Sequence, residues 1–240
     1  MSFLKNLAAA LWLMLPVLAG GPAHAQRVLL HAEVANDTVY TSFGPNRAFF
    51  NHLYLGYLPV IGRAAAGAKL HYGNSAELML GLRNKFRLSE PLSVGVDLRF
   101  VRLVYVLDQT SQKLLPTPAL HHRESLVAAQ WQLEGFVRLN VGQRGNVLGR
   151  YLDLTGWGGW VMSTAHRYED RPGTGAKKVQ VVERGLPYLE RWPYGVGARL
   201  GSGRCAAVAR YRLSDTFTSS YRTSYPELPR WTVGVELGWL

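Results

Sequence analysis

Histidines beside acidic and hydroxyl residues are the side chains of this sequence that could do chemistry. His121 and His122 are adjacent and stand just before Glu124 and Ser125. Together with Ser125 or Asp108, such a histidine could supply the nucleophile–base pair of a hydrolase. The spacing is not diagnostic, because these residues fall in a predicted loop of undetermined conformation. We therefore predict no catalytic residues and a non-enzymatic protein; an enzyme acting on lipid A or peptides is the alternative.

Metal and phosphate chemistry also lack a recognisable motif. Paired histidines without a third or fourth ligand at a defined spacing do not specify a zinc site. The run GQRGNVLG at 142–149 lacks the Lys-Ser/Thr ending of a phosphate loop and precedes no helical pattern, so we interpret it as a turn. We predict no metal and no cofactor. The histidines beyond the first 25 residues are His31, His52, His71, His121, His122 and His166.

Residues 1–25 have the organisation of a secretory signal peptide. Lys5 gives a positive start, residues 7–18 form an apolar core, and Ala-His-Ala at 23–25 is a small-x-small cleavage site. The core is shorter than the roughly 20 apolar residues that a membrane-spanning helix needs. No cysteine follows it, so a bacterial lipoprotein anchor is not predicted. We expect export and a mature chain that begins near Gln26.

The formal charge of +11 requires an anionic counterpart or a well-solvated basic surface. An exported protein does not meet the genome, so we predict no nucleic acid and favour anionic lipid headgroups or lipopolysaccharide phosphates as partners. Cys205 is the only cysteine, which excludes an internal disulfide. No later stretch of 18 apolar residues predicts a transmembrane helix.

Apolar and polar residues alternate with period two along most of the remaining chain, a pattern typical of β-strands with one apolar face. Short or Gly-rich turns alternate with longer polar loops between these segments. Outer-membrane barrels show this alternation of short turns and long loops. The predicted strands are 46–58, 76–88, 92–106, 124–141, 150–163, 188–200, 205–215 and 231–239.

The residues on the polar faces decide which side of the barrel is apolar. Water-soluble barrels and sandwiches point their apolar face inward. Here the polar faces carry both signs of charge and many glycines, and the strands are long enough for tilted strands that cross hydrocarbon in about 9 to 11 residues. We predict that the apolar faces contact lipid and that a polar network fills the lumen, made by Glu77, Arg83, Lys85, Asp97, Arg99, Glu134, Arg138, Asp153, Arg199, Arg210, Arg212 and Glu236.

Large aromatic residues on the apolar faces predict a girdle at the membrane interface. Ordinary core aromatics are the alternative interpretation. The residues are Trp131, Trp160, Trp192, Tyr194, Tyr211, Trp231 and Trp239.

We therefore predict an all-β fold: an eight-stranded antiparallel up-and-down transmembrane β-barrel over residues 47–240, in the bacterial outer membrane. Residues 26–46 are either a periplasmic N-terminal segment or an extra hairpin turning at Asn36-Asp37, which would give ten strands. Eight strands leave an interior that side chains fill, so a small-solute channel is the weaker alternative.

Four runs carry a family resemblance: ELMLGLRNKFRLSEPLSVGVDLRF, GQRGNVLGRYLDLTGWGGWV, ARYRLSDTF and the ending ELPRWTVGVELGWL. Together they resemble the outer-membrane β-barrel proteins of Bacteroidota, the broad PorT-like group, from about residue 47 onward. The resemblance implies insertion by the barrel-assembly machinery, and a secretion-system protein as a candidate partner. One departure is the ending Trp239-Leu240, where many outer-membrane proteins end on an aromatic residue.

The function that these features predict is a structural or interaction platform. Its extracellular loops would bind lipopolysaccharide or a secretion-system partner. The basic residues in or beside the long loops are Arg63, Lys69, Lys113, Arg167, Arg171, Lys177, Lys178 and Arg222.

Overall fold

The computed structural model describes residues 44–142, 149–173 and 175–239. The chain separates into two units, Met1–Val39 and Tyr40–Leu240, and the fold below belongs to the second. The predicted signal peptide lies outside the described residues, as does nearly all of the segment 26–46. The alternative with ten strands therefore stays a prediction.

The second unit is all-β. In the described residues the only helical element is a 3-10 turn, η2 (Tyr72–Asn74), and no helix is long and apolar enough to cross a membrane. The strands are β1 (Phe49–Ile61), β2 (Ala76–Arg87), β3 (Leu92–Leu107), β4 (Arg123–Val141), β5 (Arg150–Asp170), β6 (Val179–Arg184), β7 (Tyr194–Ser202), β8 (Cys205–Arg212) and β9 (Trp231–Trp239).

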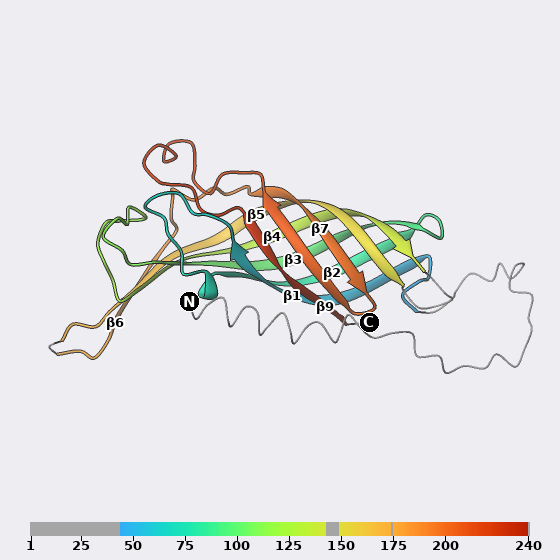
Figure 1. The fold of residues 1–240 in the computed structure, drawn as a ribbon, viewed down its shortest axis with the longest axis horizontal. Helices are drawn as coiled ribbons and strands as arrows, with labels where there is room; N and C mark the ends of the chain where they lie inside the picture. Colours follow the sequence, from blue (N-terminus) through green and yellow to red (C-terminus); the bar gives the residue numbers. More distant parts are fainter. Residues whose placement is uncertain (1–43, 143–148, 174, 240) are drawn as a thin grey trace, which may run out of the picture. The chain divides into compact units, whose positions relative to one another are not determined.

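Eight of these strands close into an antiparallel barrel, which confirms the predicted fold. The order is β4-β3-β2-β1-β9-β8-β7-β5, and pairing of β4 with β5 closes the ring (Figure 1). Each strand of the ring pairs antiparallel with both neighbours, so side chains alternate between lumen and exterior along every strand. The ninth strand, β6, lies outside the ring and pairs with β5 alone.

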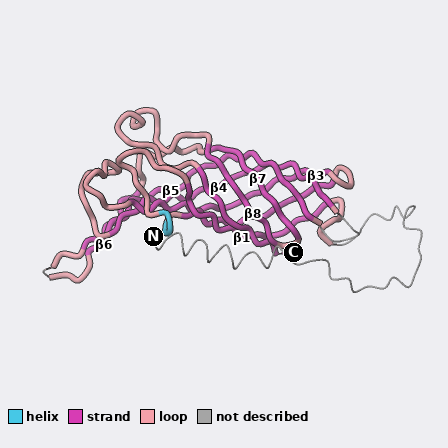
Figure 2. Tube along the Cα trace, viewed as in Figure 1, coloured by secondary structure: helices cyan, strands magenta, loops and turns pink. Residues whose placement is uncertain are grey.

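At the loop end of the ring, three of its strands continue as a sheet that we call the extension; residues 102–104 of β3, where it begins, still pair with β2. The extension consists of 102–107 of β3, 123–129 of β4, 163–170 of β5, and β6 (Figures 1 and 2). A register shift between Ala129 and Gln130 marks where β4 and β5 enter it. The extension carries polar residues on both faces, unlike the barrel strands.

The sequence pattern misplaced two boundaries here and missed one strand. It predicted a loop at 167–178 and a strand from 188, whereas β5 runs to Asp170, β6 was missed, and β7 begins only at Tyr194. Both strands of the β5–β6 hairpin lack the apolar face that period-two matching detects. Pro187 and Pro193 lack the N–H that a central strand must donate, so residues 185–193 leave the sheet.

The long connections all lie at the end of the barrel that carries the extension, and they pack together there. We call this group the loop cluster. Each of four long connections contributes at least one buried apolar side chain, which packs against strand residues that face the lumen. The barrel is therefore closed by an apolar core at its loop end. The cluster comprises Ala68, Leu70, Leu115, Leu189, Phe217 and Leu228 from the connections, with Val60, Tyr105, Leu107 and Leu126 from the strands.

Candidate functional site

The lumen holds charged side chains in a balanced arrangement. All twelve residues assigned to the lumen from the sequence are buried. Ten of them, five carboxylates and five guanidiniums, form the set that we call the ionic lattice. Its members are Glu77, Asp97, Glu134, Asp153, Glu236, Arg83, Arg99, Arg138, Arg199 and Arg210. Ion pairs connect eight of the ten, and the remaining pair, Arg210 with Glu77, joins them through Gln132.

Arg199 of β7 is the centre of the lattice. Its guanidinium reaches carboxylates on four other strands: Glu134 at 2.7 Å, Asp153 at 2.7 Å, Glu236 at 2.8 Å and Asp97 at 3.5 Å. Gln132 joins the two ends of the set, because its carbonyl accepts hydrogen bonds from Arg99 and Arg210. The other pairs are Arg83 with Asp97 and Glu236, Arg138 with Asp153, Arg99 with Glu134, and Arg210 with Glu77.

Two of the twelve residues lie apart from the lattice. Lys85 donates a hydrogen bond to the carbonyl of Pro45, and Arg212 pairs with Glu227 at 3.0 Å in the last long connection. Arg212 also donates to the carbonyls of Ser214 and Leu228. It therefore ties the loops to the barrel rather than joining charges across the lumen.

Inward-facing aromatic rings support the lattice, a feature that sequence reasoning missed. The guanidinium carbon of Arg138 lies 3.7 Å from the ring centre of Tyr151, and that of Arg210 lies 4.3 Å from the ring centre of Trp157. Such contacts add cation–π attraction to the ion pairs.

Each of these rings faces a glycine on the adjacent strand. Tyr151 is paired with Gly201, and Trp157 with Gly195. A Cβ on Gly201 would lie 2.1 Å from the Tyr151 ring, which leaves no room for any other residue. The same pairing recurs for Tyr54 with Gly81 and Phe136 with Gly95. An aromatic residue at a charged-face position could have indicated this arrangement from sequence.

The outer face of the barrel is apolar. Large hydrophobic side chains on β1–β5 and β7–β9 point away from the lumen, and many are more than 40% exposed. On β3, β4 and β5 the band ends in aromatic rings that lie side by side: Phe100 and Trp131 are 5.6 Å apart, and Trp131 is paired with Trp160. This distribution is the reverse of a water-soluble barrel.

The seven predicted girdle residues divide between the two ends of the outer face. Trp239 lies at the short-turn end, where the sequence analysis missed a further aromatic pair, Phe49 and Phe86, whose rings are 5.1 Å apart. Trp192 precedes β7 instead of lying within a strand. The residues toward the loop end are Trp131, Trp160, Trp192, Tyr194, Tyr211 and Trp231.

Beyond the aromatic rings, a basic groove occupies the outer face of the extension. Arg102 of β3, Arg123 of β4, Arg167 of β5 and Lys178 line it. Lys178 pairs with Glu169, whereas the three arginines form no ion pair within the described residues. The Nε of Arg167 also has no hydrogen-bond partner there. The groove therefore has unneutralised donors for an anion.

The loop cations expected from sequence are mostly neutralised. Lys113 is buried and pairs with Glu124, so it belongs to no binding surface. A loop lysine has no periodicity that would have predicted this burial. Arg63 and Lys177 are exposed and form no ion pair in the described part of the chain. The remaining pairs are Lys69 with Asp108, Arg171 and Lys178 with Glu169, and Arg222 with Asp215.

The histidines do not assemble the nucleophile–base pair considered from sequence. Ser125 lines the basic groove on the outer face, and Asp108 pairs with Lys69. His121 instead bonds Asp170 of β5, with Nδ1 3.0 Å from the carboxylate. The only role these contacts show is attachment of the connection between β3 and β4 to the extension.

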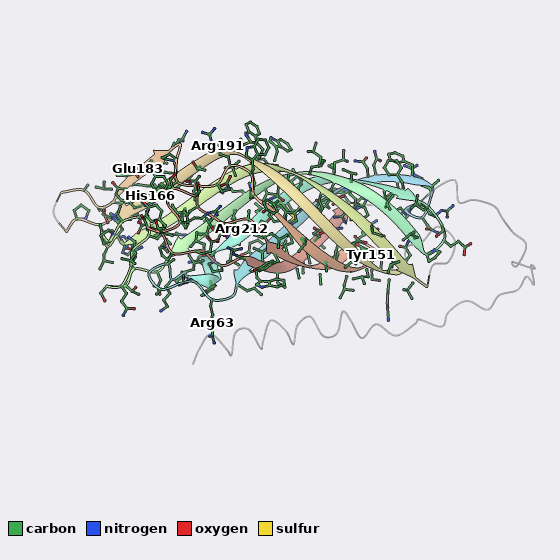
Figure 3. All side chains as sticks on the ribbon, turned by 90° about the horizontal axis from the view of Figure 1, so that it is seen from above. Arg63, Tyr151, His166, Glu183, Arg191 and Arg212 are labelled. Atoms are coloured by element: carbon green, nitrogen blue, oxygen red, sulfur yellow. The ribbon has the colours of Figure 1, made fainter. Side chains whose placement is uncertain are left out.

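His166 joins the inner face of the extension to the β6 hairpin. Its Nε2 lies 2.7 Å from Glu124 and its Nδ1 lies 2.9 Å from Glu183 (Figure 3). The two carboxylates lie on opposite sides of the ring and so do not converge on one point. Accordingly, no group of three metal-binding side chains occurs among the described residues.

The charge state of this cluster predicts a pH dependence. Burial disfavours both charged forms, but hydrogen bonds from His166, Lys113 and Gln109 lower the pKa of Glu124 below 4.5, and those to Glu124 and Glu183 raise the pKa of His166 above 6.5. The contribution of Glu124 to the stability of the extension is complete above pH 4.5 and is lost as pH falls through its lowered pKa. The contribution of His166 to that stability is complete below pH 6.5 and is lost as pH rises through its raised pKa.

We therefore expect the extension to be most stable between about pH 4.5 and 6.5. The protection factors of the β6 amides against hydrogen exchange should fall about fivefold at alkaline pH. This is equivalent to about 1 kcal/mol for one weakened charged hydrogen bond. In His166→Gln the protection factors of β6 should be low both within this pH window and at alkaline pH. A wild-type profile that stays flat to pH 9 would contradict this.

No protein-family model matches this chain, and no curated protein shows significant similarity to it. The resemblance to PorT-like barrels therefore stays a prediction.

Proposed function

We propose that the protein is a non-enzymatic β-barrel of the bacterial outer membrane and a platform for anionic lipid headgroups, specifically lipopolysaccharide phosphates. The observation that carries the proposal is the order of side chains on the outer face of β3, β4 and β5. An apolar band is followed by aromatic rings and then by the basic groove. This order matches the hydrocarbon, interfacial and phosphate layers of a membrane leaflet.

The apolar band and the ionic lattice together support membrane insertion. Burying apolar area stabilises by about 25 cal/mol per Å², so an apolar exterior is favourable only against lipid or a large partner. The residues of the lattice would be well solvated on an outer surface but are paired inside. The export predicted from residues 1–25 is consistent with this location.

The basic groove suits a phosphate group. Arg102, Arg123 and Arg167 approach it from three neighbouring strands, and a guanidinium binds phosphate through two parallel hydrogen bonds. Because the strands are held in register by the sheet, the backbone positions of the three arginines are fixed before a ligand binds. Such preorganisation lowers the entropy cost of binding.

The closed interior favours a platform over a channel. The lattice spans the lumen from β2 to β7, and the loop cluster covers its loop end. Both features agree with an eight-stranded barrel whose side chains fill its interior. Planar-bilayer recordings of the purified protein should show no stable conductance.

The groove predicts a specific loss of lipopolysaccharide binding. In the triple variant Arg102→Gln/Arg123→Gln/Arg167→Gln, binding of labelled lipopolysaccharide to the protein in neutral-lipid nanodiscs should weaken about 100-fold, at about 1 kcal/mol for each cation lost. The fold should persist, because these side chains lie on the outer face of the extension.

The matched control removes the same charge elsewhere. Arg63→Gln/Lys177→Gln/Arg191→Gln changes three exposed cations outside the groove and should weaken binding only a few-fold. Equal losses in the two triple variants would show that net charge alone acts, and would reject the groove. A lipid A mass spectrum altered by the wild-type gene would favour the enzyme instead.

A further inference from the structure

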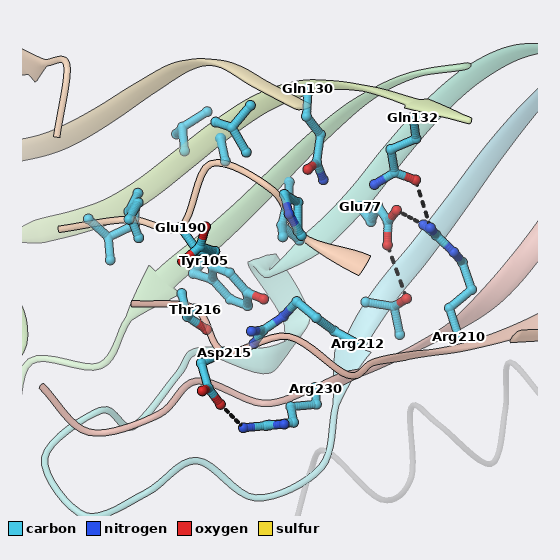
Figure 4. A pocket seen from close by; sticks show the side chains of 18 of the residues that line it. Glu77, Tyr105, Gln130, Gln132, Glu190, Arg210, Arg212, Asp215, Thr216 and Arg230 are labelled. Atoms are coloured by element: carbon cyan, nitrogen blue, oxygen red, sulfur yellow. Dashed lines mark hydrogen bonds and ion pairs between the residues drawn. The ribbon is translucent and has the colours of Figure 1, made fainter. Parts of the chain in front are cut away.

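A cavity of about 70 Å³ lies inside the barrel between the ionic lattice and the loop cluster. Gln130, Gln132 and Arg210 form part of its wall on the lattice side (Figure 4). Tyr105 and Leu189 belong to the loop cluster and form part of the other side. The basic groove is a separate feature, on the outer face of the sheet.

Four polar atoms of the cavity wall are buried without a hydrogen-bond partner in the described residues. They are Gln130 Oε1, Gln132 Nε2, Trp157 Nε1 and Arg210 Nε. All four side chains are at least nine-tenths buried. In Figure 4 the amides of Gln130 and Gln132 both point into the enclosed space. Leaving such a group unpaired costs about 1 to 3 kcal/mol, so a concentration of four indicates a site that a ligand completes.

Three of the four atoms are fixed donors. The indole of Trp157 and the guanidinium of Arg210 can only donate. The amide of Gln132 is oriented by its own contacts, since its oxygen already accepts from Arg99 at 2.9 Å and from Arg210 at 2.7 Å. Its nitrogen is therefore the atom left without a partner. A ligand that satisfies these donors must present acceptor oxygens.

The charges of the wall favour an uncharged ligand. The three arginines of the cavity wall have acidic partners: Arg210 pairs with Glu77, Arg230 with Asp215, and Arg212 with Glu227. An added carboxylate would lose its hydration without a free cation to pair with, which is costly in a buried site. A carbonyl or ester oxygen meets the donors without that penalty.

One side of the wall is apolar, and the volume of the cavity limits the size of the ligand. One water-sized sphere needs about 10 to 15 Å³ of such space, so the cavity admits roughly five to seven non-hydrogen atoms. Water could satisfy the donors but would find no polar partners along the apolar side. That side is formed by Leu103, Leu126, Ala128, Val161, Leu189 and Pro193.

We propose that this cavity binds the carbonyl end of a small uncharged acyl compound, an ester or amide. Gln132, Trp157 and Arg210 hold its oxygens, and the apolar side takes its hydrocarbon part. Glu190, Asp215, Thr216 and Arg230 line the cavity and are only partly buried, so the ligand reaches solvent beside the loop cluster, between the connection that precedes β7 and the connection between β8 and β9. The site is closed on its other side by the lattice.

Methyl butanoate is a probe of suitable size and chemistry. Titrated into isotopically labelled protein in nanodiscs, it should shift the Trp157 indole N–H resonance in a saturable manner, with that resonance assigned from Trp157→Phe. Butanoate and butylammonium should bind at least tenfold more weakly, because one adds a buried charge and the other lacks an acceptor. Tighter binding of either ion, or a linear shift without saturation, would overturn the proposal.

Two adjacent alanines provide a matched pair of variants. Ala128 lines the cavity, whereas Ala129 is paired with outward-facing Arg102 on the opposite face of β4. Ala128→Leu should fill the apolar side and weaken methyl butanoate binding at least tenfold, and Ala129→Leu should leave it within about twofold. Circular dichroism and heat-modifiable mobility identify folded protein before titration. Equal affinities in the two folded variants would reject this cavity as the binding site.

Discussion

Replacing Arg199 with leucine is expected to lower the free energy of unfolding of the barrel by about 3 to 5 kcal/mol. The variant removes the cation that four buried carboxylates share. Their mutual repulsion is then no longer offset by the guanidinium; the four are Glu134, Asp153, Glu236 and Asp97. Because these groups have no access to bulk water, removal of one partner costs more than the pair itself contributes. Urea titration of the refolded protein in lipid vesicles, followed by heat-modifiable gel mobility, measures the change.

Two further variants separate the lattice from general effects of charge. Arg63→Leu removes an exposed arginine outside the lattice and should change the unfolding free energy by less than about 0.5 kcal/mol. Arg199→Lys keeps the charge but loses the planar fork that contacts several carboxylates, so it should fall between the other two. If Arg199→Leu proved as stable as wild type, the lattice would not be a structural element.

Placing an arginine on the apolar band is expected to destabilise the protein by about 2 to 4 kcal/mol in a bilayer. Leu80→Arg is the sharpest test, because Leu80 is 55% exposed on β2 and its paired neighbours, Leu55 and Phe100, face the same way. In lipid the new charge loses its hydration; on a water-facing surface it would be tolerated. Folding yield and urea stability in vesicles report the difference.

Leu120→Arg is the matched control for this prediction. Leu120 is similarly exposed, at 56%, but lies in the connection between β3 and β4. We expect this variant to fold into vesicles with nearly unchanged stability. If Leu80→Arg were also neutral, the apolar band would not face hydrocarbon, and the proposed placement in the outer membrane would fail.

The barrel strands were predictable because their pattern is local. Alternation at 76–88 and 92–106 matches β2 and β3 to within a residue at each end. Each side chain of a strand points to the opposite face from its neighbour, so the polar set could be assigned to one side before any partner strand was known. The β5–β6 hairpin was missed for the same reason, since it has no apolar face.

The contacts of the candidate sites were not predictable in this way. Arg199 and Asp97 are 102 positions apart, and their meeting depends on how the strands are staggered when the ring closes. Lys113 is buried because the connection between β3 and β4 folds over Glu124, and irregular connections have no periodic pattern from which burial could be predicted. The facing of Tyr151 and Gly201 is likewise a consequence of register.

The sequence by itself determined which side chains share a face, because strand geometry converts spacing in the chain directly into direction. It thereby determined that charged and apolar residues lie on opposite sides of one sheet. Only the tertiary structure decided which charges meet, where the unpartnered donors of Gln132, Trp157 and Arg210 gather, and which loop cations stay free. Those outcomes depend on ring closure and loop packing, which join residues far apart in the chain.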